Sequence, residues 1–346
     1  MKTPRGIHAG EHEIARRGGA LALAIALACI TATGYSSGVA ADTVDIDRAP
    51  PPADETLGET AKGHGAISIA YLGTLSEGLY VDRNLTLPVG NVHSRGIALD
   101  LDYNFADAWS LHVGLPYISN RYDGHAPHCP TSMPVQCQNL PALAPQHPES
   151  KFLDDGRYHG TFQDWTLGVA WHTQIADYQI TPSITATIPS HDYTFFANAA
   201  VAQDIWQLEF ATTLAHQFQF SNLYYRIGYG YVFTEKTLTT DVNHHKVNLE
   251  LGYFVNEKFS VRAFGIGRAG HGYAARNLLP VTAGQTNEYW YHHDQISEHN
   301  YFGLGLGFDY ELFDRTTVSA AVQRLVWGQT VFDFKYAAEL RLTRAF

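Results

Sequence analysis

Charged side chains occur at every second residue inside otherwise apolar segments. Asp100 and Asp102 alternate with leucines, and Asp309 and Glu311 alternate with aromatic residues. Charges kept away from lipid must pair with one another or meet water. The positions of this kind are Asp100, Asp102, His112, Glu209, Arg226, Glu250, Arg262, Asp309, Glu311, Lys335, Glu339 and Arg341. Two interpretations stay open for this mixture of acids and bases: structural ion pairs, or a selectivity region that sorts solutes by charge.

A nucleophilic catalytic site would need a serine, a histidine and an orienting acid that converge from separate positions. The nearest candidate is Ser190, His191 and Asp192. Because these three residues are adjacent in sequence, we expect their side chains not to converge. The sequence therefore predicts that the protein is not an enzyme, and a lipid hydrolase remains only as an alternative.

Cysteines and histidines are the remaining residues with metal or redox chemistry. Cys129 and Cys137 enclose the proline-containing stretch "CPTSMPVQC", which predicts a loop disulfide in an oxidising compartment. The neighbouring His125 and His128 match no tight Cys/His template. Further loop histidines are His244, His245, His292, His293 and His299. Adjacent histidines usually diverge, so the sequence predicts no metal site and no cofactor.

The elements that must carry these residues have a period of two. In "YFGLGLGFDYEL" (301–312), Phe302 to Tyr310 present one apolar face, and glycines and acids occupy the other face. The same pattern, with minor irregularities, predicts strands at 66–72, 95–105, 109–118, 165–175, 180–188, 206–218, 223–233, 246–255, 259–269, 301–312, 317–327 and 331–346. Each strand therefore has one face suited to lipid and one suited to a polar or crowded interior.

The predicted connections alternate between short and long along the chain, except that the link at 328–330 is short where a long one is expected. Short links at 106–108, 176–179, 219–222, 256–258 and 313–315 are separated by longer links at roughly 73–94, 119–163, 190–204, 234–245 and 271–298. A soluble β-sandwich has no reason to keep its long loops on one side. This asymmetry is typical of membrane barrels with short periplasmic turns. The sequence therefore predicts an all-β, transmembrane, antiparallel up-and-down β-barrel of about 12 strands.

The N-terminal segment predicts export. Arg16 and Arg17 precede the apolar run at 20–30, and Val39 and Ala41 fit the positions before a signal-peptidase cleavage site. We therefore expect a cleaved signal peptide at 1–41 and a barrel at 65–346. The acidic, proline-containing segment 42–64 is expected to be a disordered periplasmic lead, and a plug threaded into the lumen is its alternative.

Two stretches resemble known outer-membrane proteins. The final strand ends in Phe346, which resembles the C-terminal signal that the barrel-assembly machinery reads. The hairpin "YNFADAWSLHVGLPYIS" (103–119) resembles the outer-membrane transporter family named for the meta-pathway of phenol degradation. That resemblance implies a barrel that admits small, often aromatic or apolar compounds. It supplies no ligand motif to transfer to individual residues.

Taken with the composition, these features predict an outer-membrane channel or transporter for small solutes with a narrow lumen. Only 16% of the residues are charged while 45% are hydrophobic, and the net charge of −11 argues against nucleic acid as a partner. The expected partners are outer-membrane lipid and lipopolysaccharide, the barrel-assembly machinery and a small-molecule solute. A structural or adhesive barrel is the alternative function.

Overall fold

The computed structural model describes residues 61–82, 85–128, 150–273 and 287–346. The expectations for the signal peptide at 1–41, for the lead up to residue 60 and for the pairing of Cys129 with Cys137 lie outside these residues. No described helix is long and apolar enough to cross a membrane.

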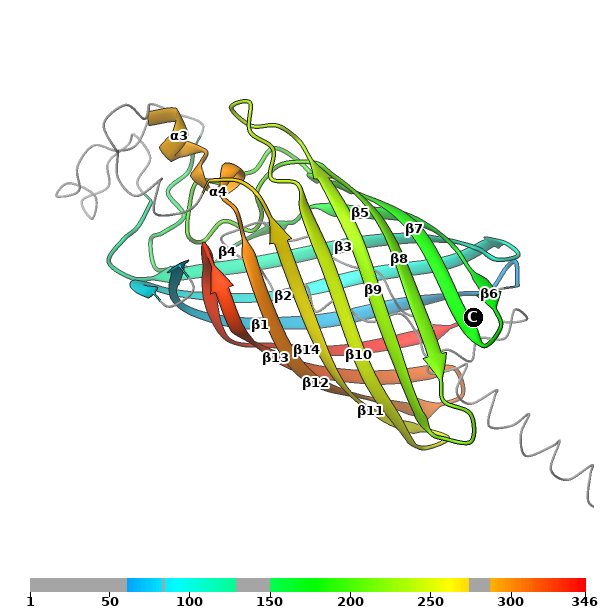
Figure 1. Cartoon of the computed structure of the whole chain (residues 1–346). Coiled ribbons are helices and arrows are strands. Elements are labelled where there is room, and N and C mark those ends of the chain that lie inside the picture. The colour runs from blue at the N-terminus through cyan, green and yellow to red at the C-terminus, as the bar shows by residue number, and fades with distance from the viewer. Residues whose placement is uncertain (1–60, 83–84, 129–149, 274–286) are drawn as a thin grey trace, which may run out of the picture.

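The described chain forms one closed antiparallel sheet (Figure 1). Its strands are β1 (Gly65–Asp82), β2 (Leu85–Ala106), β3 (Trp109–Asp123), β4 (His159–Phe162), β5 (Trp165–Trp171), β6 (Thr173–Ile175), β7 (Tyr178–Ile188), β8 (Gln207–Gln217), β9 (Leu223–Thr234), β10 (His244–Asn256), β11 (Phe259–Gly270), β12 (Asn300–Phe313), β13 (Thr316–Gln329) and β14 (Val331–Ala345). Strands β4 and β5 both pair with β3, and β5 and β6 both pair with β7. These three are therefore pieces of one interrupted strand, and the barrel has 12 strands, which confirms the predicted fold class.

Closure of the barrel depends on its first and last strands. Strand β1 pairs with β14 from Ala66↔Ala345 to Tyr80↔Val331. Gly65 and Phe346 extend this seam at the short-turn end. Each donates a backbone hydrogen bond to the carbonyl of the other, at 3.1 and 2.9 Å. Because the described sheet closes on itself, its first and last strands have no free edge, and pairing is incomplete at the interrupted strand, where β4 pairs with β3 alone and β6 with β7 alone.

The two faces of each strand differ as the period of two requires. On β12, Leu304 and Leu306 are 50% and 64% exposed on the outer surface. Gly305 faces inward, where a Cβ atom would lie only 2.2 Å from the Phe264 ring. The glycines of this strand therefore make room for side chains that fill the interior. Trp109 and Trp171, stacked at 6.3 Å, belong to the outer aromatic surface near the short-turn end.

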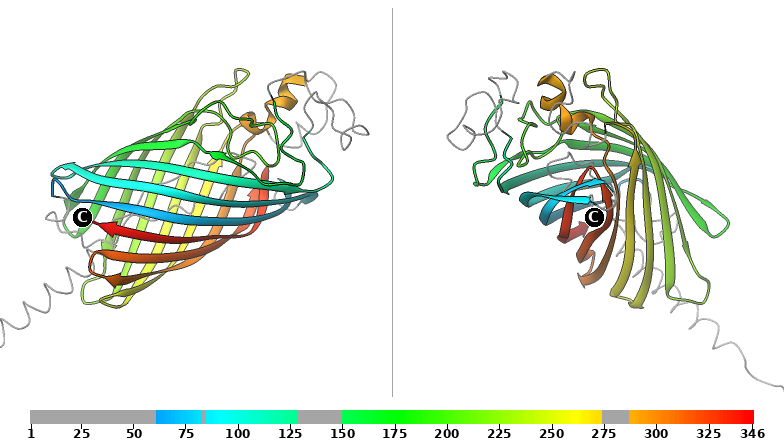
Figure 2. Two further views of the ribbon diagram at one scale, coloured as in Figure 1. Left: turned by 180° about the vertical axis from the view of Figure 1, so that it is seen from behind. Right: turned by 60° about the vertical axis from the view of Figure 1, so that its left-hand side comes forward.

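The two ends of the barrel are unequal (Figures 1 and 2). Short turns and the C-terminus lie at one end. The long connections, with α3 (Asn287–Tyr291) and α4 (His293–Ile296), lie at the other end, which we call the loop end. The expected long link at 73–94 is instead an extended hairpin, because β1 and β2 continue to Asp82 and from Leu85. The pairing between β1 and β2 continues here through register shifts, one of them at Gly78, which has a φ of 78°. The alternation of apolar and polar residues is therefore irregular in this part of the hairpin.

The start of β14 departs from simple alternation. Counting by twos places Phe332 and Phe334 on the lipid face, but they are only 7% and 1% exposed. The cause is a bulge: Leu75 pairs with Tyr336 while Ser76 pairs with Phe334, so Lys335 is an extra residue. The outward face of this strand begins at Tyr336, and both phenylalanines turn into the barrel.

Candidate functional site

Four neighbouring strands bring opposite charges together on the inner wall. Arg226 Nη1 on β9 lies 3.2 Å from Glu250 Oε1 on β10. Arg262 Nε on β11 lies 3.6 Å from the other oxygen of Glu250, and the Arg262 guanidinium also pairs with Asp309 on β12. Two bases and two acids therefore alternate around the wall, and the formal charge of this cluster is zero.

A second charged cluster joins β14, β2 and β3. Arg341 pairs with Asp100 across the closing seam, and its Nε lies 2.6 Å from Glu339 Oε1. Asp102 Oδ1 lies 2.9 Å from His112 Nδ1. With three carboxylates and one guanidinium, this side of the lumen is acidic when His112 is neutral.

Glu209 of β8 has an ion-pair partner that the sequence analysis missed. Its Oε2 lies 3.1 Å from Lys246 Nζ on β10, across the intervening strand β9. Gly230 on β9 permits the contact, since a Cβ there would lie 2.5 Å from Glu209 Oε1. Lys246 lies four residues before Glu250 in the predicted strand 246–255, so both side chains point to the same face. That spacing could have identified Lys246 as a lumen residue.

The two remaining predicted positions lie away from these clusters. Lys335 occupies the bulge of β14, where Nζ is 2.8 Å from Asp333 Oδ2 and 4.0 Å from Glu77 Oε2. Glu311 lies close to the short turn that follows β12, and its backbone N–H donates to the Lys258 carbonyl at 2.9 Å. Neither residue belongs to the ion pairs of the central wall described above.

Breaking the first cluster should destabilise the barrel. Glu250→Leu would leave Arg226 and Arg262 without their shared carboxylate, and uncompensated buried charge costs about 3–5 kcal/mol. We expect the free energy of unfolding in urea, measured on the protein in detergent micelles, to fall by about this amount. Glu311→Gln, near the short turn that follows β12, is the control. The expected change in its free energy of unfolding is within about 0.5 kcal/mol. Equal effects of the two substitutions would contradict a paired central cluster.

The connection between β7 and β8 folds into the barrel, and we call residues 189–206 the inward loop. Phe196, Ala197, Ala200 and Ile205 are at most 1% exposed. The Asn120 side chain, on the inner face of β3, donates to the Ala200 carbonyl at 2.6 Å. Tyr193, Val201 and Ala202 pack with Ile118 of β3, and Ala199 packs with Val92, Tyr122 and Phe332 of β2, β3 and β14. The inward loop therefore extends across the loop end of the lumen to strands distant from its own.

Asp154 and α4 hold the inward loop from two sides. The Asp154 carboxylate accepts backbone hydrogen bonds from Asn198 at 3.1 Å and from Ala199 at 2.9 Å. Gln203 and Gln295 fix the loop to α4: Gln203 Nε2 donates to the Asp294 carbonyl, and Gln295 Nε2 donates to the Gln203 carbonyl, both at 2.6 Å. The loop is thus layered between the barrel wall and α4.

Burial of the inward loop also affects its charge. Burial, with the negative charges of Asp192 and Glu235, raises the pKa of Asp204 to about 6. A carboxyl with a raised pKa binds its proton more tightly in this position than in water. Its protonation therefore stabilises the inward position, and this contribution is lost as pH rises from about 4 to about 6.

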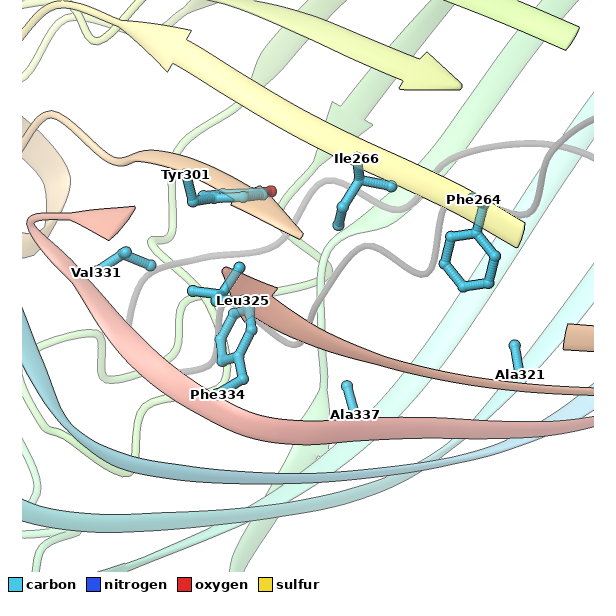
Figure 3. Close-up of a cluster of buried hydrophobic side chains, with 8 residues drawn as sticks. All are labelled: Phe264, Ile266, Tyr301, Ala321, Leu325, Val331, Phe334 and Ala337. Atoms are coloured by element: carbon cyan, nitrogen blue, oxygen red, sulfur yellow. The ribbon is translucent and has the colours of Figure 1, made fainter. Parts of the chain in front are cut away.

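The inner wall of β11–β14 is apolar towards the loop end (Figure 3). Side chains from these four strands form one cluster, consisting of Phe264, Ile266, Tyr301, Ala321, Leu325, Val331, Phe334 and Ala337. Phe334 joins it only because of the bulge at Lys335. The inner wall therefore contains a packed apolar cluster, whose members are at most 9% exposed, as well as the charged clusters.

The serine and histidine of the catalytic candidate do meet, contrary to expectation. Ser190 Oγ and His191 Nδ1 lie 2.8 Å apart. The other ring nitrogen of His191 lies 2.9 Å from the Thr161 hydroxyl, which is not an orienting carboxylate. Ser190 Oγ also donates to the Phe162 carbonyl at 3.0 Å. These contacts connect the inward loop with β4, and they do not reproduce the order of a catalytic triad.

The candidate histidines have separate surroundings, and His244 and His245 begin strand β10 instead of lying in a loop. His244 Nδ1 lies 3.0 Å from the Val242 carbonyl, His245 Nδ1 lies 2.7 Å from the Tyr229 hydroxyl, and His292 Nδ1 lies 2.5 Å from Gln295 Oε1. His299 is 1% exposed. His293 instead meets His128 and Asp294, and the ligand atoms of these three residues lie within 4.8 Å of one another.

Solved outer-membrane proteins have similar folds. The COG4313 outer membrane channel from Pseudomonas putida F1 aligns with a TM-score of 0.60 and 12% identity, covering 82% of this chain and 96% of that one. The KdgM porin aligns with a TM-score of 0.42 and 8% identity, covering 81% and 99%. A FadL homologue from Pseudomonas aeruginosa aligns with a TM-score of 0.34 and 9% identity, covering 92% and 99%. At these identities, the first likeness shows a shared barrel fold.

Sequence comparisons add no closer assignment. No protein-family model matches the chain, and no curated protein sequence matches it. Membership of the phenol-degradation transporter family therefore stays a prediction.

Proposed function

We propose that the protein is an outer-membrane channel through which small solutes pass, restricted at the loop end by the inward loop. The observation that carries this proposal is a 12-stranded lumen lined by charged side chains and crossed by the inward loop. Barrels of about 8 strands are filled by side chains, and those of about 16 leave an aqueous channel. A barrel of intermediate size suits a narrow path. The similar structure from Pseudomonas putida is described as a channel, which supports the same function here.

The lining favours small solutes that carry an aromatic or apolar part. The inner wall combines the apolar cluster on β11–β14 with the ion-paired clusters, so both apolar and charged side chains lie along the proposed path. This combination agrees with the resemblance of the 103–119 hairpin to transporters of aromatic compounds. Export through a signal peptide at 1–41, assembly through Phe346 and contact with lipopolysaccharide complete the proposal for an outer-membrane location.

Solute uptake by liposomes tests the proposal. We expect vesicles containing the full chain to take up a phenolic carboxylate and a monosaccharide faster than empty vesicles do. Asp102→Asn should increase the uptake rate of the carboxylate relative to that of the sugar by about 2- to 17-fold. A unit charge about 10 Å from the solute contributes roughly 0.4–1.7 kcal/mol at effective dielectric constants of 20–80.

Lys62→Gln, outside the lumen clusters, serves as the charge-change control. Uptake equal to that of empty vesicles for both solutes would contradict the channel and favour a structural or adhesive barrel. An unchanged ratio in Asp102→Asn would contradict the role of the acidic cluster in selection.

A further inference from the structure

Two connections from nearly opposite sides of the barrel meet at the loop end. His128 follows β3, while His293 and Asp294 lie in α4, which leads into β12. The two imidazole Nε2 atoms lie 3.1 Å apart, and His293 Nε2 also lies 3.1 Å from Asp294 Oδ1. We propose that His128, His293 and Asp294 bind a divalent transition-metal ion, preferably Zn²⁺, which joins α4 to the segment after β3 above the inward loop.

Two of the three donor separations match those of a tetrahedral ion. Zinc binds imidazole nitrogen and carboxylate oxygen at about 2.0–2.2 Å, so neighbouring ligand atoms of a tetrahedral site lie about 3.3 Å apart. The two separations that involve His293 Nε2 are within about 0.2 Å of that value, and the third, between His128 and Asp294, is within 4.8 Å. Three protein ligands leave a fourth position for water or another small ligand.

Each imidazole has an oxygen atom as its neighbour at Nδ1, and the Nε2 atoms of the two rings face each other. A carbonyl oxygen only accepts, so His293 Nδ1 carries the proton that it donates to the Trp290 carbonyl at 2.7 Å. His128 Nδ1 lies 3.4 Å from Asp154 Oδ2 without a hydrogen bond, so the carboxylate favours a proton on Nδ1 through its charge alone. Two neutral rings held in this way repel each other unless a metal cation or a shared proton lies between them. Carboxylate and carbonyl partners of this kind are the usual support of metal-binding histidines.

The surroundings shield the three ligands from bulk water. The side chains of His128, His293 and Asp294 are 10%, 14% and 15% exposed. Trp290 stacks on His293 with ring centroids 4.3 Å apart, and Phe196 of the inward loop meets His128 edge-on at 4.9 Å. A bound ion would therefore connect α4 and the segment after β3 directly above a buried residue of the inward loop.

The donor set selects among metals. Imidazole suits Zn²⁺, Cu²⁺ and Ni²⁺, whereas Ca²⁺ and Mg²⁺ require mostly oxygen ligands. Sequence alone gave no support for this group, because His128 and His293 are 165 positions apart. The fold brings them together.

Metal titration of the intact protein tests the site. The full chain, folded in detergent micelles and stripped with a chelator, is titrated with Zn²⁺ against a chromophoric competitor. A Cys29→Ser/Cys129→Ser/Cys137→Ser background removes thiols as ligands. We expect one Zn²⁺ per chain, a visible absorption band of tetrahedral Co²⁺ on substitution, and no competition by Ca²⁺.

Single-residue variants show whether the proposed ligands hold the ion. His128→Ala and His293→Ala should each weaken Zn²⁺ affinity at least about 100-fold, since losing even a supporting partner costs 10- to 100-fold. Asp294→Asn preserves the side-chain size and should weaken affinity about 10- to 100-fold, which covers the case in which a histidine variant fails to fold. His271→Ala is the control, because that imidazole is 64% exposed and pairs with Asp241 elsewhere. Affinity unchanged in the three ligand variants, or no binding by the parent protein, would overturn the site and leave a histidine pair that shares a proton.

The effect of the ion on transport rests on the proposed channel function. Zinc should lower the conductance of the parent protein, and a chelator should restore it, with no zinc response in His293→Ala. Zinc binding without any conductance would preserve the metal site and contradict the channel. Conductance without zinc binding would contradict only the metal site.

Discussion

Leu249→Arg should prevent stable assembly of the barrel, while Asn248→Arg should be tolerated. Leu249 is 41% exposed on the outer face near the middle of β10, and Asn248 is its inward-facing neighbour. An arginine on the lipid face near the midplane costs about 2–4 kcal/mol, whereas the lumen accepts polar groups. Refolding yield into lipid vesicles, followed by the mobility of unheated and heated samples on gels, measures the difference.

The adjacent positions make this comparison well matched. Both variants add the same side chain to the same strand at nearly the same depth. Greater sensitivity at Asn248 would mean that the inner and outer faces are the reverse of those described.

Replacing residues 192–204 by a short Gly/Ser linker should raise the conductance of the channel at least about twofold, because a 12-stranded barrel is wider than one filled by its own wall. The replaced segment includes Ala197, Ala199 and Ala200, which are completely buried at the loop end. Single-channel recording in planar bilayers measures the change. Shortening the tip of the β9–β10 connection, where Thr237 and Thr240 bond to each other, is the control.

The control should leave the conductance unchanged. A loop replacement that folds normally but conducts like the parent protein would show that the inward loop does not restrict the path.

The sequence predicted the barrel well because its signal is local. A period of two separates Leu249 from Glu250 without any knowledge of distant contacts, and the order of short and long links follows directly from it. The twelve strands and most of their faces could therefore be assigned before the structure. The bulge at Lys335 could not, because a single extra residue reverses the parity of Phe332 and Phe334 and only pairing with β1 reveals it.

The site was predicted only in part, because its remaining features depend on long-range contacts. The residues of the charged clusters could be named, but their partners could not, since Arg341 and Asp100 are 241 positions apart. The inward loop has no periodicity, and its phenylalanines and alanines were the one hint that it would be buried. The meeting of Ser190 with His191 was missed because neighbouring side chains can converge where the backbone turns.

Single-channel recording of the full chain in planar lipid bilayers tests the central claim most directly. The proposed path through the lumen predicts small, discrete conductance steps that become larger when residues 192–204 are replaced. A silent protein, with residues 42–60 both present and deleted and with the inward loop both present and replaced, would contradict the channel.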